Sequence, residues 1–194
     1  RYRDAVAAAA PDMTRLPDDV VTEIMLWGRD RMVAQFKETL GRLRVGHDIW
    51  TNESSVYEGP GEHRGFRGEV AKALEELDAE DLLYEEEGAV WLKTTHYGDD
   101  KDRVLIRSSG EPTYFLSDIA YHRDKIDRGW ERLIDIWGAD HHGYVPRMKA
   151  AFTALPPHDP ERLELIIGQF VNLLEGGEQK RMSKRKGTIV TVDD

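Results

Sequence analysis

The sequence of 194 residues contains no cysteine, which excludes disulfide bonds and thiolate metal sites and is compatible with a reducing cytoplasm. No apolar run approaches the roughly 20 residues that a membrane-spanning helix needs, and the N-terminal residues lack the ordered regions of a signal peptide. A formal net charge of -10 argues against a surface that binds nucleic acid all over. We therefore expect a soluble, cytoplasmic protein with no membrane or DNA partner, in which a local cluster of cations binds any phosphate.

Two features of the chain ends also stand out. The sequence has no initiator methionine and begins with a helix-like composition, and it stops directly after an apolar run that is typical of a strand. From this pattern we expect an interior piece of a larger protein.

Apolar residues recur at steps of three and four over residues 17–45, which predicts a helix. We expect acidic Asp18 and Asp19 in its first turn, a break near Gly28 and an end at Gly46.

A short strand is predicted at 47–51. The elements predicted after it belong to a small insertion. These are a glycine-rich connector at 59–68, a short helix with Val70, Leu74 and Leu77 inward, two strands over 82–94 that turn at Glu87-Gly88, and a third strand at 103–108.

The pattern changes after Gly110. An apolar run at 132–138 is followed by a turn, a helix and a second apolar run at 163–171, the order of a βαβ unit in a parallel sheet. This order predicts an α/β fold whose ligands lie beyond the carboxyl ends of the strands. The predicted divisions are 1–51 (helix and strand of the main domain), 52–110 (insertion with a small antiparallel sheet) and 111–194 (second half of the main domain).

A basic, glycine-rich segment at 175–190 stands out in this acidic chain. Its cations suit phosphate, and its flanking glycines allow a loop to close over a nucleotide and reopen. The alternative is a solvated charged turn. The five cations are Lys180, Arg181, Lys184, Arg185 and Lys186.

The segment Trp-Gly-Ala-Asp-His-His-Gly follows the first predicted parallel strand. As a nucleotide site, it would use Gly138 for close backbone approach and Asp140 to accept hydrogen bonds from ribose hydroxyls. His141 and His142 would contact nucleotide or phosphate. Two alternatives remain open: a helix N-cap at Asp140 with solvent-exposed histidines, and a metal site of the Asp-His-His manganese phosphoesterases.

Tyr114 and Asp118 form the third candidate site. If a helix begins near Tyr114, both side chains lie on one face at positions i and i+4, where a phenol and a carboxylate can orient a cation. The alternative is an ordinary surface pair.

Three segments, 113–125, 132–151 and 180–194, resemble the second half of the catalytic domain of bacterial arginyl-tRNA synthetases, and a looser resemblance covers nearly the whole chain. The stretch Arg181-Met182-Ser183-Lys184-Arg185 is similar to the Lys-Met-Ser-Lys-Ser loop of class I synthetases at its three central positions. The resemblance implies a Rossmann-type parallel sheet with flanking helices.

It also implies a function, arginine–tRNA ligase, with arginine, ATP and tRNA-Arg as partners. Magnesium would accompany the ATP, and no metal would be bound by the protein itself. By this resemblance, Lys184 with Lys186 or Arg181 would stabilise charge on the phosphates, and the backbone of Met182 and Ser183 would approach the adenine. The residues implied to bind the nucleotide are Gly138, Asp140, His141 and His142. The residues implied to recognise the arginine side chain are Tyr114 and Asp118.

The sequence departs from this family pattern in three ways. The first ATP signature, His-x-Gly-His, is absent, arginine stands at the first and last positions of the loop, and no helical anticodon-binding domain is present. We therefore expect the isolated chain to be inactive. The manganese phosphoesterase and a non-catalytic ATP- or tRNA-binding module are the alternative functions.

Overall fold

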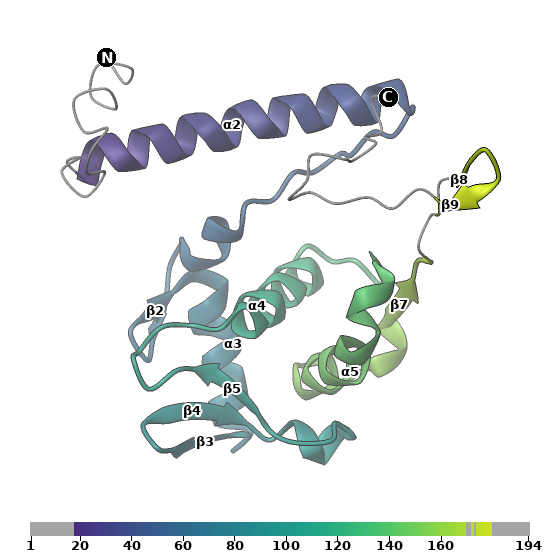
Figure 1. Cartoon of the computed structure of the whole chain (residues 1–194). Coiled ribbons are helices and arrows are strands. Elements are labelled where there is room, and N and C mark those ends of the chain that lie inside the picture. The colour runs from purple at the N-terminus through teal and green to yellow at the C-terminus, as the bar shows by residue number, and fades with distance from the viewer. Residues whose placement is uncertain (1–17, 170–171, 173, 180–194) are drawn as a thin grey trace. The chain divides into compact units, whose positions relative to one another are not determined.

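The structure is a computed structural model that describes residues 18–169, 172 and 174–179 (Figure 1). Contacts within the chain divide it into two compact units, Arg1–Trp50 with Glu175–Asp194, and Thr51–Leu174. No helix in the described part is both long and apolar enough to cross a membrane.

The first unit contains one long helix, α2 (Asp18–Arg42), with Asp18 and Asp19 in its first turn as predicted. The helix continues through Gly28, so the predicted break is wrong. A single glycine inside a helix costs only about 1 kcal/mol, which is too little to end a helix of this length. No residue of α2 is buried.

The helix ends before the predicted Gly46. Arg44 adopts a left-handed conformation with φ 59°, and the Val45 amide donates to the Leu40 carbonyl at 2.9 Å. These are features of a Schellman motif, in which Arg44 takes the position that glycine usually occupies.

The predicted strand at 47–51 is wrong, because this segment is irregular and lies in no sheet of the described chain. Its aromatic side chain finds other contacts: the Trp50 ring meets His47 edge-on at 5.3 Å and lies 4.9 Å from the Lys37 ammonium. An apolar pattern forms a strand only when a neighbouring strand supplies hydrogen bonds.

The second unit begins with a short 3-10 helix, η2 (Glu53–Tyr57), and a hairpin of β1 (Glu62–His63) and β2 (Phe66–Arg67) that the sequence did not reveal. Helix α3 (Gly68–Ala79) follows, with Val70, Leu74 and Leu77 fully buried as predicted. Its first residue must be glycine. Gly68 has φ +64°, and an added Cβ would lie 2.3 Å from the Glu58 carbonyl oxygen.

The predicted antiparallel sheet is confirmed. Its strands β3 (Leu83–Glu86), β4 (Ala89–Leu92) and β5 (Arg103–Ile106) pair in sequence order. Glu87 and Gly88, both with positive φ, form the predicted turn, as a two-residue hairpin of type I′ requires.

The predicted βαβ unit is also confirmed. Helix α4 (Tyr114–Asp127) precedes it, and Thr113 caps α4 by accepting a hydrogen bond from the Leu116 amide. The unit consists of β6 (Leu133–Trp137), the 3-10 turn η4 (Ala139–Tyr144), α5 (Val145–Ala154) and β7 (Leu163–Ile167), and β6 and β7 are parallel. The remaining short elements are η3 (Thr94–Tyr97), η5 (Pro160–Arg162), β8 (Leu174–Glu175) and β9 (Glu178–Gln179).

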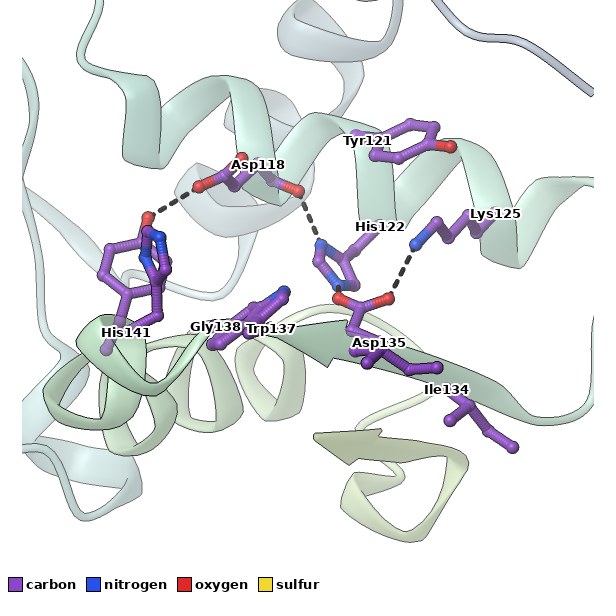
Figure 2. Close-up of a pocket in the computed structure, with 11 residues that line it drawn as sticks. Asp118, Tyr121, His122, Lys125, Ile134, Asp135, Trp137, Gly138 and His141 are labelled. Atoms are coloured by element: carbon purple, nitrogen blue, oxygen red, sulfur yellow. Dashed lines mark hydrogen bonds and ion pairs between the residues drawn. The ribbon is translucent and has the colours of Figure 1, made fainter. Parts of the chain in front are cut away.

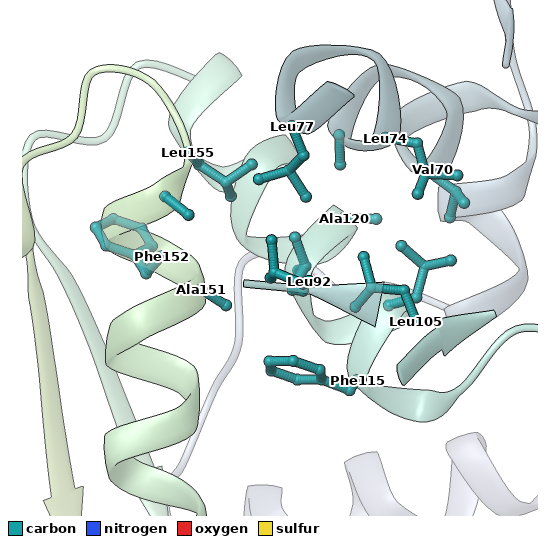
Figure 3. Packing of buried hydrophobic residues seen from close by; sticks show 14 of the residues in the cluster. Val70, Leu74, Leu77, Leu92, Leu105, Phe115, Ala120, Ala151, Phe152 and Leu155 are labelled. Atoms are coloured by element: carbon teal, nitrogen blue, oxygen red, sulfur yellow. The ribbon is translucent and has the colours of Figure 1, made fainter. Parts of the chain in front are cut away.

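The hydrophobic core of this unit packs α3, α4 and α5 against the antiparallel sheet (Figure 3). Leu74 and Leu77 from α3, Leu92 from β4 and Phe152 from α5 all belong to one buried cluster. The core is thus continuous across residue 110, and the predicted boundaries at 51 and 110 stay predictions. This core fixes α4 relative to β6, and the candidate site lies between those two elements.

Candidate functional site

A cavity of about 560 Å³ lies between one face of α4 and the end of β6 (Figure 2). Helix α4 contributes residues at steps of three and four, as expected for one helical face, and β6 with the turn after it contributes the opposite wall. The lining residues are Asp118, Tyr121, His122, Lys125, Ile134, Asp135, Ile136, Trp137, Gly138, His141 and Tyr144.

Asp118 is a carboxylate whose hydrogen-bond partner is a neutral hydroxyl. Its Oδ2 accepts a hydrogen bond of 2.7 Å from the Tyr144 hydroxyl, and no Lys or Arg in the described part of the chain forms an ion pair with it. Burial raises the pKa of Asp118, and the Tyr144 hydrogen bond offsets part of that rise. The charge of His122 also lowers this pKa, whereas the charges of Glu53 and Asp135 raise it. The carboxylate therefore keeps acceptor capacity for a cation.

Asp135, on β6 in the same cavity, has a hydrogen-bond partner on each of its two carboxylate oxygens. Its Oδ2 lies 2.8 Å from His122 Nε2, and its Oδ1 accepts from Lys125 Nζ at 2.8 Å. Burial raises the pKa of Asp135, but the hydrogen bonds and charges of His122 and Lys125 outweigh this effect and lower it to about 2.

His122 connects the two carboxylate-bearing elements (Figure 2). Its Nδ1 lies 2.7 Å from the backbone carbonyl of Asp118, which can only accept, so Nδ1 carries a hydrogen. Its Nε2 lies 2.8 Å from the Asp135 carboxylate on β6. The buried imidazole therefore ties α4 to β6.

Tyr114 and Asp118 lie on one helical face, as their spacing predicts, and both line a second cavity of about 260 Å³. Tyr114 is 78% exposed. Glu53 also lines this cavity, and its charge raises the pKa of Asp118. Sequence reasoning did not find Glu53, because it lies in a short polar segment without periodicity.

The predicted nucleotide segment lies directly after β6, at the carboxyl end of a parallel strand. Gly138 and His141 line the larger cavity, whereas Asp140 and His142 are exposed beside it. An added Cβ at Gly138 would lie 2.8 Å from the Asp140 side chain, so glycine leaves room for that carboxylate.

Two alternative roles for this segment find no support in the described residues. Asp140 lies inside η4, and the residue that precedes this turn is Gly138, so Asp140 is not an N-cap. Within the described ranges, no three His, Asp or Glu side chains form a group suited to a metal ion.

The structure adds Tyr144, His122, Lys125 and Asp135 to the residues that the sequence singled out. The spacing of His122 and Lys125, four and seven residues after Asp118 on one helix, was a usable signal. The predicted loop residues Arg181, Met182, Ser183, Lys184 and Lys186 lie outside the described part of the chain.

Comparison with known proteins identifies relatives over most of the chain. The family described as tRNA synthetases class I (R), catalytic domain, matches residues 30–194. The arginine–tRNA ligase of Syntrophotalea carbinolica is 44% identical over 191 residues, which cover 98% of this chain and 33% of the relative. The arginine–tRNA ligase of Anoxybacillus flavithermus is 51% identical over 160 residues, which cover 82% of this chain and 27% of the relative.

Solved structures show the same fold. An arginyl-tRNA synthetase structure from Campylobacter jejuni matches with a TM-score of 0.75 at 37% identity, over 92% of this chain and 38% of that one. The Thermus thermophilus arginyl-tRNA synthetase matches with a TM-score of 0.67 at 19% identity, over 96% of this chain and 36% of that one. At this identity the match supports the fold alone. These matches confirm the predicted α/β, Rossmann-type fold class. The chain spans about a third of the length of the curated relatives it matches.

Proposed function

This chain belongs to the family of class I tRNA synthetases (R), catalytic domain, and from that membership we propose that the complete gene product carrying it is an arginine–tRNA ligase. The arginine carboxylate attacks the α-phosphate of ATP and displaces pyrophosphate. A hydroxyl at the 3′ end of tRNA-Arg then attacks the activated carbonyl and displaces AMP. Magnesium accompanies the ATP, and the reaction takes place in the cytoplasm.

The observation that carries this proposal is the environment of Asp118. A half-buried carboxylate with a raised pKa, one hydroxyl donor and no ion-paired cation among the described residues suits a guanidinium ligand. Guanidinium can donate two parallel hydrogen bonds to such a carboxylate and compensate its burial. Tyr114 and Glu53 line the same smaller cavity and add an aromatic ring and a second negative charge.

The nucleotide is assigned to the turn after β6. Ligands of parallel α/β sheets bind beyond the carboxyl ends of the strands, and this turn begins at that point. Gly138 allows backbone approach, Asp140 accepts from ribose, and His141 and His142 contact the nucleotide. The cavity wall at Gly138 and His141 joins this turn to the face of α4 that carries Asp118.

The basic loop supplies charge to the departing phosphates. Lys184, with Lys186 or Arg181, stabilises the negative charge that develops on pyrophosphate, and the backbone at Met182-Ser183 approaches the adenine. Because this charge grows in the transition state, the loop acts on rate more than on arginine affinity.

The test is arginine-dependent ATP–pyrophosphate exchange by the complete gene product, with tRNA-Arg present. Lys184→Ala should lower adenylate formation roughly 100- to 1,000-fold, because it removes one donor to the transition-state charge. The KM for arginine should stay within about twofold, since the lysine contributes little in the ground state.

Lys149→Ala is the matched control, because Lys149 lies on the solvent-exposed side of α5 and lines neither cavity of the site. It should leave the exchange rate unchanged. No exchange with any amino acid by the wild type would overturn the proposed function. A Lys184→Ala rate within about threefold of wild type would remove Lys184 from its proposed role.

A further inference from the structure

Tyr144 is one of the residues of the site to which the sequence assigned no role. Its hydroxyl donates to Asp118 Oδ2 at 2.7 Å, across 26 positions of the sequence. Burial raises the pKa of the Tyr144 phenol, and the negative charge of Asp118 raises it further, so the phenol stays a donor. A single O–H can donate to only one carboxylate oxygen, which leaves the other free.

The Tyr144 ring is held on several sides. It meets Phe115 edge-on at a centroid distance of 5.8 Å and Trp137 at 5.6 Å, and the Arg147 guanidinium lies 5.0 Å from its centre. These contacts come from α4, β6 and α5. The hydroxyl is therefore fixed in place by packing, and the freedom of the Asp118 carboxylate is reduced with it.

Tyr144 is also the last residue of the turn η4, which carries Asp140, His141 and His142. The turn is closed by hydrogen bonds from the His141 amide to the Gly138 carbonyl and from the Val145 amide to the His142 carbonyl. A ligand that shifts this turn moves the base of the Tyr144 side chain.

We propose that Tyr144 is a positioning residue that orients the Asp118 carboxylate for the guanidinium of arginine and links arginine binding to the nucleotide turn. This inference rests on the proposed function. Tyr144 contacts neither substrate in this arrangement, and it acts through Asp118.

The first test is Tyr144→Phe in the complete gene product, a change that keeps the ring and removes only the hydroxyl. The KM for arginine should rise roughly tenfold or more, in line with a hydrogen bond to a charged group, while the KM for ATP should stay within about twofold. Tyr97→Phe is the control, because Tyr97 is a partly buried tyrosine on η3 that lines neither cavity, and it should change neither value.

The pH dependence of arginine binding provides a second readout that lost packing alone would not produce. The groups that act on Asp118 are Tyr144 from η4, His122 on its own helix, Glu53 from η2 and Asp135 from β6. Arginine binding requires ionised Asp118, and the Tyr144 hydroxyl favours that form. Without it, the rise of the arginine KM on acidification should begin at a higher pH than in wild type.

Two further measurements test whether Tyr144 acts through Asp118 and whether it couples arginine binding to nucleotide binding. In an Asp118→Asn background, Tyr144→Phe should add little to the arginine KM, because its effect passes through Asp118. Wild-type affinity for arginine should change several-fold when a non-hydrolysable ATP analogue with Mg²⁺ is added, and Tyr144→Phe should reduce that factor toward one.

An unchanged arginine KM and pH profile in Tyr144→Phe, or full additivity with Asp118→Asn, would overturn the inference. An unchanged arginine KM in Asp118→Asn itself would instead contradict the proposed arginine site. The two failures are therefore distinguishable.

Discussion

Two carboxylates, Asp118 and Asp135, line the same cavity and have opposite electrostatic environments. Asp135 has two partners at 2.8 Å, His122 and Lys125, and a pKa lowered to about 2. Asp118 has one neutral donor, and its pKa is raised. Asp135 is thus already compensated within the protein, whereas Asp118 has no ion-paired cation among the described residues.

The two groups lie on different elements and have different consequences for stability. Asp135 holds β6 to α4 through His122 and Lys125, so its charge contributes to folding. Asp118 on α4 is a charge that the unliganded fold accommodates at a cost, because burial favours its neutral form. Such a cost is expected where binding a ligand supplies the missing partner.

The largest expected effect is on stability at Asp135. Asp135→Ala leaves the buried His122 and the partly buried Lys125 without the carboxylate that they share, so the free energy of unfolding should fall by about 3–5 kcal/mol. Urea denaturation of this chain at neutral pH measures it. Glu164→Ala, which removes an exposed ion pair with Arg132, is the control and should cost no more than about 1 kcal/mol. Equal effects of the two substitutions would show that Asp135 is no more structural than a surface carboxylate.

The next effect is on substrate selection at Asp118. Asp118→Asn in the complete gene product should weaken arginine binding by about 1.5–3 kcal/mol, because it removes a charge-assisted interaction. In this chain, the same substitution should leave the free energy of unfolding unchanged or raise it slightly, since the amide has no burial cost of a charge. Calorimetric titration with arginine and urea denaturation measure both quantities. A loss of stability equal to that of Asp135→Ala would break the distinction between the two residues.

The smallest expected effect is on the pH dependence of the free energy of unfolding, and its direction differs between the two carboxylates. The folded pKa of Asp135 is about 2, below the unfolded value of about 3.9, so its stabilisation is present above pH ~4 and is lost as the pH falls toward 2. The difference in unfolding free energy between wild type and Asp135→Asn should therefore shrink over this range.

Asp118 should show the opposite sign, because its folded pKa is raised. Protonation favours the folded state there, so wild type should gain stability relative to Asp118→Asn as the pH falls toward the unfolded value. Parallel pH profiles for the two variants would contradict the assignment of opposite environments.

The regular elements were predictable where the sequence repeats a clear period. The inward face of α3, the Glu87-Gly88 turn, the start of α4 and the order of β6, α5 and β7 all follow from local patterns. The strand expected at 47–51 failed, because a strand requires a partner that no local pattern supplies. The hairpin of β1 and β2 was missed because two-residue strands carry no measurable alternation.

The candidate site was predictable only in part, because some of its residues come together only through packing between elements. Asp118 and Tyr114 were found from their spacing on one helix, and Gly138 and Asp140 from their position after an apolar strand. Tyr144 and Glu53 reach the same region from elsewhere in the chain. Their proximity depends on packing between elements, which sequence spacing does not encode.

Helical periodicity alone is enough to place Asp118, His122 and Lys125 on one face of α4. The order of the residues likewise places the turn with Asp140 after a buried strand. Which of the two carboxylates is compensated depends instead on how the elements pack. The pKa of a carboxyl group depends on its burial and on charges within a few ångströms, and both were set when β6 brought Asp135 against His122 and η4 brought only a hydroxyl to Asp118.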